Sequence, residues 1–367
     1  MGFIQFIKEL ILSAFSVLNG ASVWLVASFL LAGFLREALS PDKFQKMLGN
    51  KKISSLVKST VSGMLLPICS CGVIPLGISM YYSGAYLGPT LAFMTSTPMI
   101  NPVAVVLCYG LLGKEITLIY VITGFVSPII IGIIANIFAG KELKAPGIEG
   151  QLEQRSLIRE KKSFLEKTKI GMEWAISDLA LVVSKYVILG MLFAAVIFNV
   201  IPQEFIQKYL GNPSVISLGG ITVMAAVMYV CAVGHIPFIA AIIASGAAPG
   251  VAITFLMAGA ATNLPELISI YKLIGKRAVI IYSTVVIGIS LVVGYITNLV
   301  LMPNFKPILN FDSVNSSIET ANKIMFVAPD WMKYFCSCII IYFGCKALYK
   351  GFKSKLANRK NLKHNLY

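Results

Sequence analysis

Apolar runs of similar length alternate with short polar stretches along this 367-residue chain. Most runs hold roughly 20 residues, the length that a helix needs to cross the hydrocarbon core of a bilayer. Because hydrocarbon offers the backbone no hydrogen-bond partners, each run is expected to form a helix. The expected spans lie at about 17–36, 59–80, 89–112, 115–139, 178–201, 214–243, 250–271, 278–302 and 331–349. The pattern predicts an all-α polytopic membrane protein.

Composition and charge agree with this class. Hydrophobic residues make up 57% of the chain and charged residues 13%, whereas about a quarter of a soluble protein is charged. The net charge of +15 comes from loops and from the tail KSKLANRKNLKHNLY (353–367), where basic residues follow the positive-inside bias and meet anionic headgroups. We therefore expect a multi-pass protein of the cytoplasmic membrane that contacts lipids, has no nucleic-acid partner and needs no cofactor.

One unit is written twice along the chain. When the sequence is shifted along itself without gaps so that Phe44 meets Ile206, FQKMLGN (44–50) aligns with IQKYLGN (206–212). Under this offset, called the repeat shift below, the matches continue at residue types that apolar composition alone would not align. They include Cys69 with Cys231, Gly72 with Gly234, Pro75 with Pro237, Gly84 with Gly246, Gly88 with Gly250 and Asn101 with Asn263. We interpret the chain as two four-segment repeats followed by one extra C-terminal transmembrane helix.

These repeats divide the chain into five regions. The first membrane repeat covers 1–140 and the second covers 172–302, with a charged linker at 141–171 between them. An extramembrane loop is expected at 303–330, and the last transmembrane helix with its basic tail at 331–367.

The charge pattern constrains the direction of the two repeats. Loop 36–58 and the linker are both rich in Lys and Arg, so both are expected on the cytoplasmic side. Three apolar runs lie between them, and three full crossings would put them on opposite sides. Either the linker departs from the charge rule, or one segment per repeat enters the membrane and returns. We favour the second interpretation, which makes the repeats inverted.

Prolines interrupt corresponding runs in both repeats. They are Pro67, Pro75, Pro89, Pro98 and Pro102 in the first repeat, and Pro237, Pro249 and Pro265 in the second. Each removes a backbone donor and disfavours a continuous helix. Kinks in an ordinary helical bundle would explain one or two of these prolines. Paired interruptions are typical of secondary transporters, whose substrate sites lie at broken helices near the midplane.

The stretch PICSCGVIP (67–75) places two thiols among these helix breakers. Residues two apart point to nearly opposite sides of a helix but share a face in an extended segment. If the prolines and Gly72 break the helix, Cys69 and Cys71 can converge on one point. Cysteine can also be a small buried hydrophobe. We interpret Cys108 and Cys345 in that way.

The second repeat offers a different set of side chains at the corresponding place. CAVGHIP (231–237) supplies one thiol, Cys231, and one imidazole, His235. Three thiols and an imidazole suit a soft ion, because thiolates select soft metals. His235 could equally be a satisfied interior histidine. The candidate substrate-binding residues are Cys69, Cys71, Cys231, His235, Asn101 and Asn263, and the three cysteines are the candidate soft-ion ligands.

Glu266 is the most deeply placed acid by sequence and follows a proline break. Charged groups inside a membrane are costly and usually functional. Glu266 is therefore the candidate proton carrier, with a structural polar cap as the alternative. Cys336 and Cys338 form a second CxC, but on a helix these two thiols would not converge.

The segment CSCGVIPLGISMYYSGAYLGPTLAFMTSTPMINP (69–102) resembles the ArsP-type permease family, predicted membrane permeases that include organoarsenical efflux proteins. CSCGVIP, the SGA turn and TPMINP (97–102) carry the resemblance, and the apolar layout over about 17–302 is consistent with it. The resemblance implies export of trivalent arsenicals, with Cys69 and Cys71 as candidate thiol ligands. Similar sequences have also been linked to copper or zinc efflux. CAVGHIP has one cysteine where a symmetric site would have two, so the resemblance leaves the complete ligand set open.

The sequence thus predicts a secondary-active permease for a soft, thiol-reactive solute, most of all trivalent arsenicals, and not an enzyme. It contains no G-x-x-x-x-G-K-[ST] motif, so the energy is expected from an ion gradient or a partner. A soft divalent metal exporter is the alternative within transport. A membrane thiol oxidoreductase that uses the two CxC pairs is the alternative outside it, although the chain has no CxxC motif.

Overall fold

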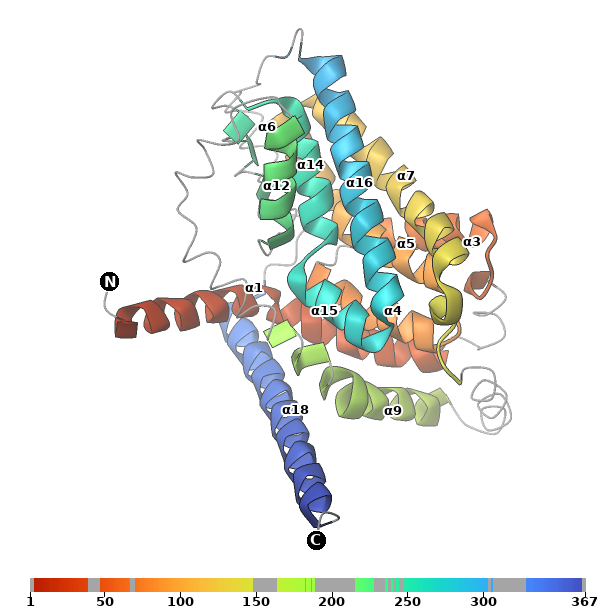
Figure 1. Cartoon of the computed structure of the whole chain (residues 1–367), viewed down its shortest axis with the longest axis vertical. Helices are drawn as coiled ribbons and strands as arrows, with labels where there is room; N and C mark the ends of the chain where they lie inside the picture. Colours follow the sequence, from red (N-terminus) through yellow and green to blue (C-terminus); the bar gives the residue numbers. More distant parts are fainter. Residues whose placement is uncertain are drawn as a thin grey trace.

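The computed structural model describes residues 3–38, 47–66, 70–147, 164–181, 183–185, 187–188, 215–227, 235–236, 239–240, 242–243, 247–302, 305 and 328–364. In this part of the chain every regular element is a helix (Figure 1). The elements are α1 (Phe3–Ala38), α3 (Ile53–Met64), α4 (Ser70–Tyr82), α5 (Leu87–Met99), α6 (Pro102–Leu112), α7 (Lys114–Phe138), η1 (Gly140–Leu143), α9 (Phe164–Trp174), η2 (Ala175–Leu179), α12 (Val215–Val227), α14 (Pro249–Ala261), α15 (Leu264–Leu273), α16 (Lys276–Leu301) and α18 (Asp330–His364). The predicted all-α class is confirmed. Most of the linker and of loop 303–330 lies outside the described residues.

Membrane-length helices are present, as the apolar runs predicted. Helix α7, helix α16 and the segment Asp330–Tyr349 of α18 are each long and apolar enough to cross a bilayer. The pairs α5–α6 and α14–α15 reach that length only when each bent pair is taken as one span, which gives up to five spans among the described residues. The spans expected at 89–112 and 250–271 are therefore broken helices.

The expected span at 59–80 is not one helix. Helix α3 has 12 residues and α4 has 13. At 1.5 Å per residue each is roughly 20 Å long, shorter than the hydrocarbon core of about 30 Å. The amide of Tyr86, after α4, donates to the carbonyl of Leu48, before α3, at 3.0 Å. The chain therefore enters the bundle along α3 and comes back along α4 to the end from which it started.

Loop 36–58 and the start of the linker lie at this same end of the bundle. Leu48 belongs to the loop, and its carbonyl accepts the amide of Tyr86. Lys144 belongs to the linker, and its Nζ lies 5.6 Å from the centre of the Tyr86 ring. This is the arrangement expected if one segment of the first repeat returns without crossing.

The helices of the second half begin at positions that correspond to those of the first. Helices α3, α5, α6 and α7 begin at Ile53, Leu87, Pro102 and Lys114, and α12, α14, α15 and α16 begin at Val215, Pro249, Leu264 and Lys276. Each start in the second half is the partner, under the repeat shift, of a start in the first. The offset that aligns the two halves of the sequence therefore also aligns their helices.

The same helix crossing also occurs twice. Gly88, in the first turn of α5, donates its amide to Asn136 Oδ1 of α7 at 3.0 Å. Gly250, in the first turn of α14, donates to Asn298 Oδ1 of α16 at 2.7 Å. A Cβ added to either glycine would collide with the asparagine side chain and with the backbone of the long helix. Only glycine allows these backbones to approach so closely.

The long helices α7 and α16 pack side by side in opposite directions (Figure 1). The carboxylate of Glu142, just after α7, accepts the amides of Arg277 and Ala278, at the start of α16, at 3.1 and 2.6 Å. The C-terminal end of one helix therefore meets the N-terminal end of the other. Because α5 and α14 each begin beside the end of their own long helix, they are antiparallel as well. Inverted repeats predict this arrangement.

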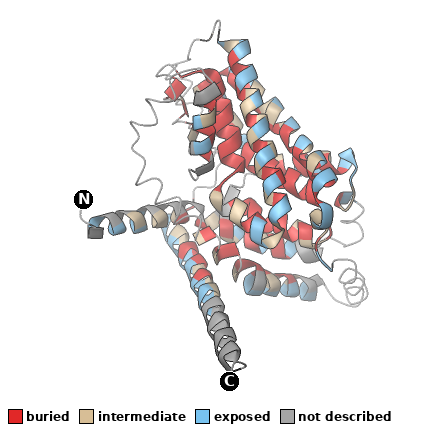
Figure 2. Ribbon diagram, in the orientation of Figure 1, coloured by how far each residue is buried: buried red, intermediate tan, exposed pale blue. Residues whose placement is uncertain are grey.

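Helices α5 and α14 form the centre of the bundle. Every residue of both helices is buried, whereas α7 and α16 expose one face each (Figure 2). The polar residues of α5 are compatible with burial because their hydroxyls bond the backbone of their own helix. Thr95 donates to the Leu91 carbonyl at 2.7 Å and Thr97 to the Phe93 carbonyl at 2.8 Å. Around this centre lie the two breaks in the broken helices.

Candidate transport site

Two helix breaks lie at matching positions of the two halves. Helices α5 and α6 meet at an angle of 43° at Asn101, and α14 and α15 meet at 41° at Asn263. Both asparagines have extended backbone, with ψ of 154° and 137°, and both are buried. Pro102 follows the first asparagine directly and favours that conformation before it. The predicted breaks at TPMINP and TNLPE are thus present.

At the first break, two side chains form hydrogen bonds with backbone groups of the half-helices. Asn101 Oδ1 accepts the amide of Ala104 at 2.7 Å and so caps the N-terminus of α6. The hydroxyl of Tyr120, on α7, donates to the carbonyl of Met99 at the end of α5. Both side chains secure the ends of the two half-helices.

The second break contains a carboxyl group. Glu266 stands in the first turn of α15, where the first break has Ala104, and its side chain is fully buried. The hydroxyl of Tyr282, on α16, donates to Glu266 Oε1 at 2.9 Å. Within the described residues, Glu266 Oε2 has no hydrogen-bond partner. Asn263 binds differently from Asn101, because its Nδ2 donates back to the Ala260 carbonyl at 3.2 Å.

The carboxyl of Glu266 is therefore half-satisfied at a helix break inside the bundle. An uncompensated charge in such a place is costly, and acids found there commonly serve ion or proton pathways. Glu266 stands in the first turn of α15, near the partial positive charge of the helix N-terminus. The role of Glu266 as a proton carrier stays a prediction.

The predicted thiol site falls mostly outside the described residues. Cys69 and Cys231 are not described, and of Cys71 the structure gives the backbone only. His235 lies in a helical turn, half-buried, with its ring centre 5.9 Å from that of Phe255 on α14. Among the described side chains, no group of three or more His, Cys, Asp or Glu is placed to hold a metal ion. The ligand set of Cys69, Cys71, Cys231 and His235 stays a prediction.

One premise for converging thiols was wrong. Gly72 and Pro75 do not break the chain, because both lie inside α4. Pro75 is close to the helix start at Ser70, so it removes at most one intrahelical hydrogen bond near that end. The interruption instead falls between Met64, where α3 ends, and Ser70. Cys71 is a helical residue of α4, whereas Pro67 and Cys69 lie outside the described residues.

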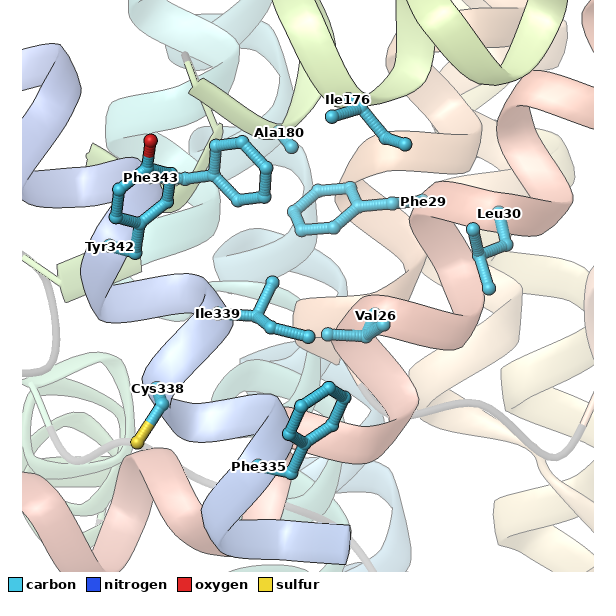
Figure 3. Close-up of a pocket in the computed structure, with 10 residues that line it drawn as sticks. All are labelled: Val26, Phe29, Leu30, Ile176, Ala180, Phe335, Cys338, Ile339, Tyr342 and Phe343. Carbon is cyan, nitrogen blue, oxygen red and sulfur yellow. The ribbon is translucent and has the colours of Figure 1, made fainter. Parts of the chain in front are cut away.

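The second CxC behaves as a helical pair. Cys336 and Cys338 both lie in α18, where Cys336 is buried and Cys338 is exposed, so they do not converge. Cys338 lines a pocket of about 460 Å³ between α1, the segment around η2 and α18 (Figure 3). The other lining residues are Val26, Phe29, Leu30, Ile176, Ala180, Phe335, Ile339, Tyr342 and Phe343. An apolar pocket with one thiol lacks the second ligand that soft-ion capture needs.

Two features of the structure are not evident from the motifs of the sequence. Tyr282 does not stand out by itself, although Tyr120 is its partner under the repeat shift. The crossing residues Asn136 and Asn298 are partners in the same way. Both pairs lie beyond 69–101, the segment of the first half where the matches are densest. Extending the shifted comparison to the end of each repeat reveals both.

Comparisons with known proteins agree with a membrane permease. The profile of a family described as predicted permease matches residues 8–299. A UPF0718 protein of Methanocaldococcus jannaschii is 27% identical, covering 76% of this chain and 91% of the relative. A UPF0718 protein of Bacillus subtilis is 24% identical, covering 75% of this chain and 92% of the relative. A Mycobacterium tuberculosis protein named as a candidate permease is 25% identical, covering 69% of this chain and 67% of the relative. No solved structure matches the chain.

Proposed function

This chain belongs to the ArsP-type family of predicted permeases, and on that premise we propose that it is a secondary-active permease of the cytoplasmic membrane that exports soft, thiol-reactive solutes, above all trivalent arsenicals. The observation that carries the proposal is the pair of matching helix breaks in antiparallel halves, with a buried carboxyl at one of them. Transporters built from inverted repeats bind their solutes at such breaks and expose the site alternately to the two sides.

We assign the transported solute from the chemistry of three cysteine thiols. Cys69 comes just before α4 in the sequence, Cys71 lies in the first turn of α4, and Cys231 is the partner of Cys69 in the second half under the repeat shift. A trivalent arsenical forms bonds to thiolate sulfur, and thiols give up protons as they bind a soft ion. Capture by thiols therefore needs no fixed charge inside the membrane. The resemblance to organoarsenical efflux proteins supports the same assignment.

Coupling is assigned to Glu266. Because the sequence lacks a nucleotide-binding loop, an ion gradient is the expected energy source. A proton taken up by Glu266 from outside would be released on the cytoplasmic side as a solute leaves. Glu266 then acts as the proton carrier, and Asn101 and Asn263 hold the ends of the half-helices around the solute.

Serine substitutions of the cysteines test the solute assignment. Cys69→Ser and Cys71→Ser are each expected to abolish high-affinity arsenical binding, and the double variant should be hardly worse than either, because residues that act as one unit are not additive. Cys108→Ser is the matched control, since this buried thiol of α6 is assigned no role. The measurements are arsenical binding to purified protein and uptake into inside-out vesicles. Wild-type export by both single variants would refute the thiol site.

A soft divalent metal is the second candidate, and His235 is the residue that favours it. Imidazole is a good ligand for zinc and copper, whereas trivalent arsenicals prefer sulfur alone. If the solute is a metal, His235→Gln should weaken zinc binding as strongly as Cys231→Ser does. If it is an arsenical, His235→Gln should leave arsenical binding intact. The same vesicle assay, run with each solute, separates the two candidates.

The inverted arrangement has its own test. Loop 36–58 and the start of the linker lie at one end of the bundle, so both should face the cytoplasm. A cysteine introduced at Glu153 in the linker should be labelled by a membrane-impermeant maleimide only from the cytoplasmic side. Labelling from the outside, with the C-terminal tail inside, would contradict the inverted arrangement.

A further inference from the structure

Three hydrogen bonds join the two halves of the molecule at one end of the bundle. The carboxylate of Glu142, in η1 just after α7, accepts the amides of Arg277 and Ala278, at the start of α16, at 3.1 and 2.6 Å. The hydroxyl of Tyr82, the last residue of α4, donates to the carbonyl of Leu273, the last residue of α15, at 2.6 Å. The linker begins at this end, which faces the cytoplasm in the proposed orientation.

We propose that these bonds form the cytoplasmic gate of the permease. They hold this end of the interface between the halves closed, and they break when the solute site opens to the cytoplasm. The inference rests on the proposed function, because a gate is needed only if the site is exposed alternately to the two sides. It goes beyond that function by naming the side chains that separate in each transport cycle. We call Tyr81, Tyr82, Glu142 and the groups that they bond the polar gate.

Two neighbouring tyrosines at the end of α4 hold the polar gate together. Tyr81 is buried and donates its hydroxyl to the Glu142 carbonyl at 2.9 Å, so it fixes the backbone that carries the carboxylate. Tyr82 bonds the second half directly, and the two tyrosine rings pack edge to face with their centres 5.5 Å apart. The end of α4 is therefore bonded both to η1 and to α15. A movement of α4 would disturb both parts of the polar gate at once.

Helix α4 also connects the polar gate with the predicted thiol site. Cys71 lies in the first turn of α4 and Tyr82 is its last residue, so the two are roughly 16 Å apart along the helix axis. A rigid helix can carry a displacement from one of its ends to the other. A solute that binds at Cys71 and shifts α4 would therefore act on the polar gate without an intermediate element.

Two glycines make room for the contact between η1 and α16. Gly140 and Gly275 have φ of +59° and +153°, a backbone conformation that other residues rarely adopt. A Cβ added to Gly140 would collide with the Arg277 guanidinium group, and one added to Gly275 would collide with the Glu142 carboxylate. The close approach of the two halves thus depends on the sequence on both sides of the polar gate.

The strength of these bonds suits a contact that opens and closes. Glu142 is half-buried and Arg277 is exposed, so water can replace the bonds between them when the halves separate. A hydrogen bond to a charged group changes an equilibrium by about 10-fold or more, and one between neutral groups by roughly 5-fold. Coupling between two sites of a protein is of the same size, so the binding of a solute or an ion can reverse the balance.

The second half does not repeat the side chains of the polar gate. Under the repeat shift, Tyr81 and Tyr82 correspond to Ile243 and Ala244, and Glu142 corresponds to Asn304. Isoleucine and alanine have no side-chain donor, and asparagine carries no charge. In an inverted pair of repeats these positions belong to the opposite end of the molecule. The two ends are therefore held by different contacts, and we expect the cytoplasmic end to be the more firmly closed.

The experiment measures both ends of the purified full-length protein with pairs of spin labels. One pair, at Lys141→Cys and Lys276→Cys, flanks the polar gate. The other pair, at Lys114→Cys and Leu299→Cys, lies at the opposite ends of α7 and α16, and all four positions are exposed. Pulsed electron paramagnetic resonance gives the distance distribution of each pair. Protein that is labelled without an introduced pair gives the background from the natural cysteines.

Removal of the gate bonds should open one end and close the other. Glu142→Ala should raise the ratio of long to short gate distances by about 10-fold, because the carboxylate bonds two amides. Glu142→Gln, which keeps one acceptor oxygen, and Tyr82→Phe should each raise the ratio by roughly 5-fold. The opposite pair should come closer in the same variants, since alternate exposure closes one end as the other opens. Tyr86→Phe is the matched control, because the Tyr86 ring lies against Lys144 at the same end, and both distances should stay unchanged.

These distances need no solute, so the polar gate and the proposed function can fail separately. A lower unfolding temperature of Glu142→Ala with unchanged distances would show that the contact is merely structural, and it would overturn the proposal. Lengthening at the gate without shortening at the opposite end, or an equal change in Tyr86→Phe, would overturn it as well. If the wild type exports no arsenical but the two ends move in opposite directions, the proposed function fails while the polar gate stands.

Discussion

At the first helix break, Asn101 and Tyr120 bond backbone groups of their own half, whereas at the second break Tyr282 donates its hydroxyl proton to the carboxyl group of Glu266. The backbones of the two breaks are nearly alike, with bends of 43° and 41° and helices that begin at partner positions of the repeat. The change of Ala104 to Glu266 accounts for most of the difference between them. Two repeats with similar backbones can thus differ in their side chains. In the first half the side chains at the break bond the backbone, and in the second half one of them is an ionisable group.

The largest effect is expected from making the second break resemble the first. Glu266→Gln keeps the volume of the side chain but removes the exchangeable proton. Export driven by a pH gradient should fall by about 100-fold or more, the range for losing a positioned acid–base group, while arsenical binding is retained. Vesicle uptake and binding to purified protein measure the two effects. Glu173→Gln, at an exposed position of α9, is the control and should behave as wild type.

Loss of binding together with transport in Glu266→Gln would indicate a structural or ligand role for this residue. Wild-type export by the variant would remove Glu266 from the mechanism.

The reverse exchange, Ala104→Glu, should harm the protein without adding function. Ala104 is fully buried at the first break, where it belongs to the apolar core of the bundle. An uncompensated buried charge costs about 3 kcal/mol or more. Thermal unfolding in detergent should show this loss, and Ala104→Gln should lose less. If Ala104→Glu restored gradient-driven export to Glu266→Ala, the two breaks would be functionally equivalent.

A smaller loss of stability, equal in the two halves, is expected at the helix crossings of Gly88 and Gly250. Gly88→Ala and Gly250→Ala each force a methyl group against the long helix that crosses there, and overpacking of this kind costs about 1–3 kcal/mol. Gly288→Ala is the control in α16, because an added Cβ at Gly288 meets nothing within 4 Å. It should be neutral or should stabilise the helix. Unfolding of the three variants in detergent tests this equality, and a clear difference between Gly88→Ala and Gly250→Ala would contradict it.

The smallest loss of stability is expected from replacing the asparagines at the two breaks, and it should differ between the halves. Asn101 caps α6 through its side chain, and loss of such a cap costs about 1 kcal/mol. Asn263 bonds the preceding turn instead, so Asn263→Ala should cost less than Asn101→Ala. Differential scanning calorimetry of both variants and of the wild type shows which variant loses more stability. The opposite order would mean that the second asparagine carries the more important contact.

Much of the fold could be predicted because bilayer length and proline chemistry act locally. The runs at 115–139 and 278–302 became α7 and α16, and the breaks lie at the proline-rich TPMINP and TNLPE. The run at 59–80 was wrongly predicted to be one span, because apolar composition does not show whether a segment crosses the membrane or turns back within it. Its return is visible in the contact of Leu48 with Tyr86, which hydropathy does not encode.

The site could be predicted from the sequence only where a single residue is unusual by its own type and position. Glu266 stood out because an acid in an apolar run is costly, and the structure places it at a break. Tyr282 did not stand out, because tyrosine is common in membrane helices. Its contact with Glu266 depends on how α15 and α16 pack, which the sequence pattern does not encode. The helix-breaking effect assigned to Pro75 was wrong, because Pro75 lies inside α4.

The contact of Glu142 with the first amides of α16 has a consequence for synthesis at the ribosome. Glu142 leaves the ribosome long before Arg277, so the first half must wait in the membrane for the helix that it caps. The wholly buried α5 has polar hydroxyls and must wait for the second half to cover it. Until α14 and α16 are made, α5 and α7 therefore lack the second-half helices that pack against them in the finished protein.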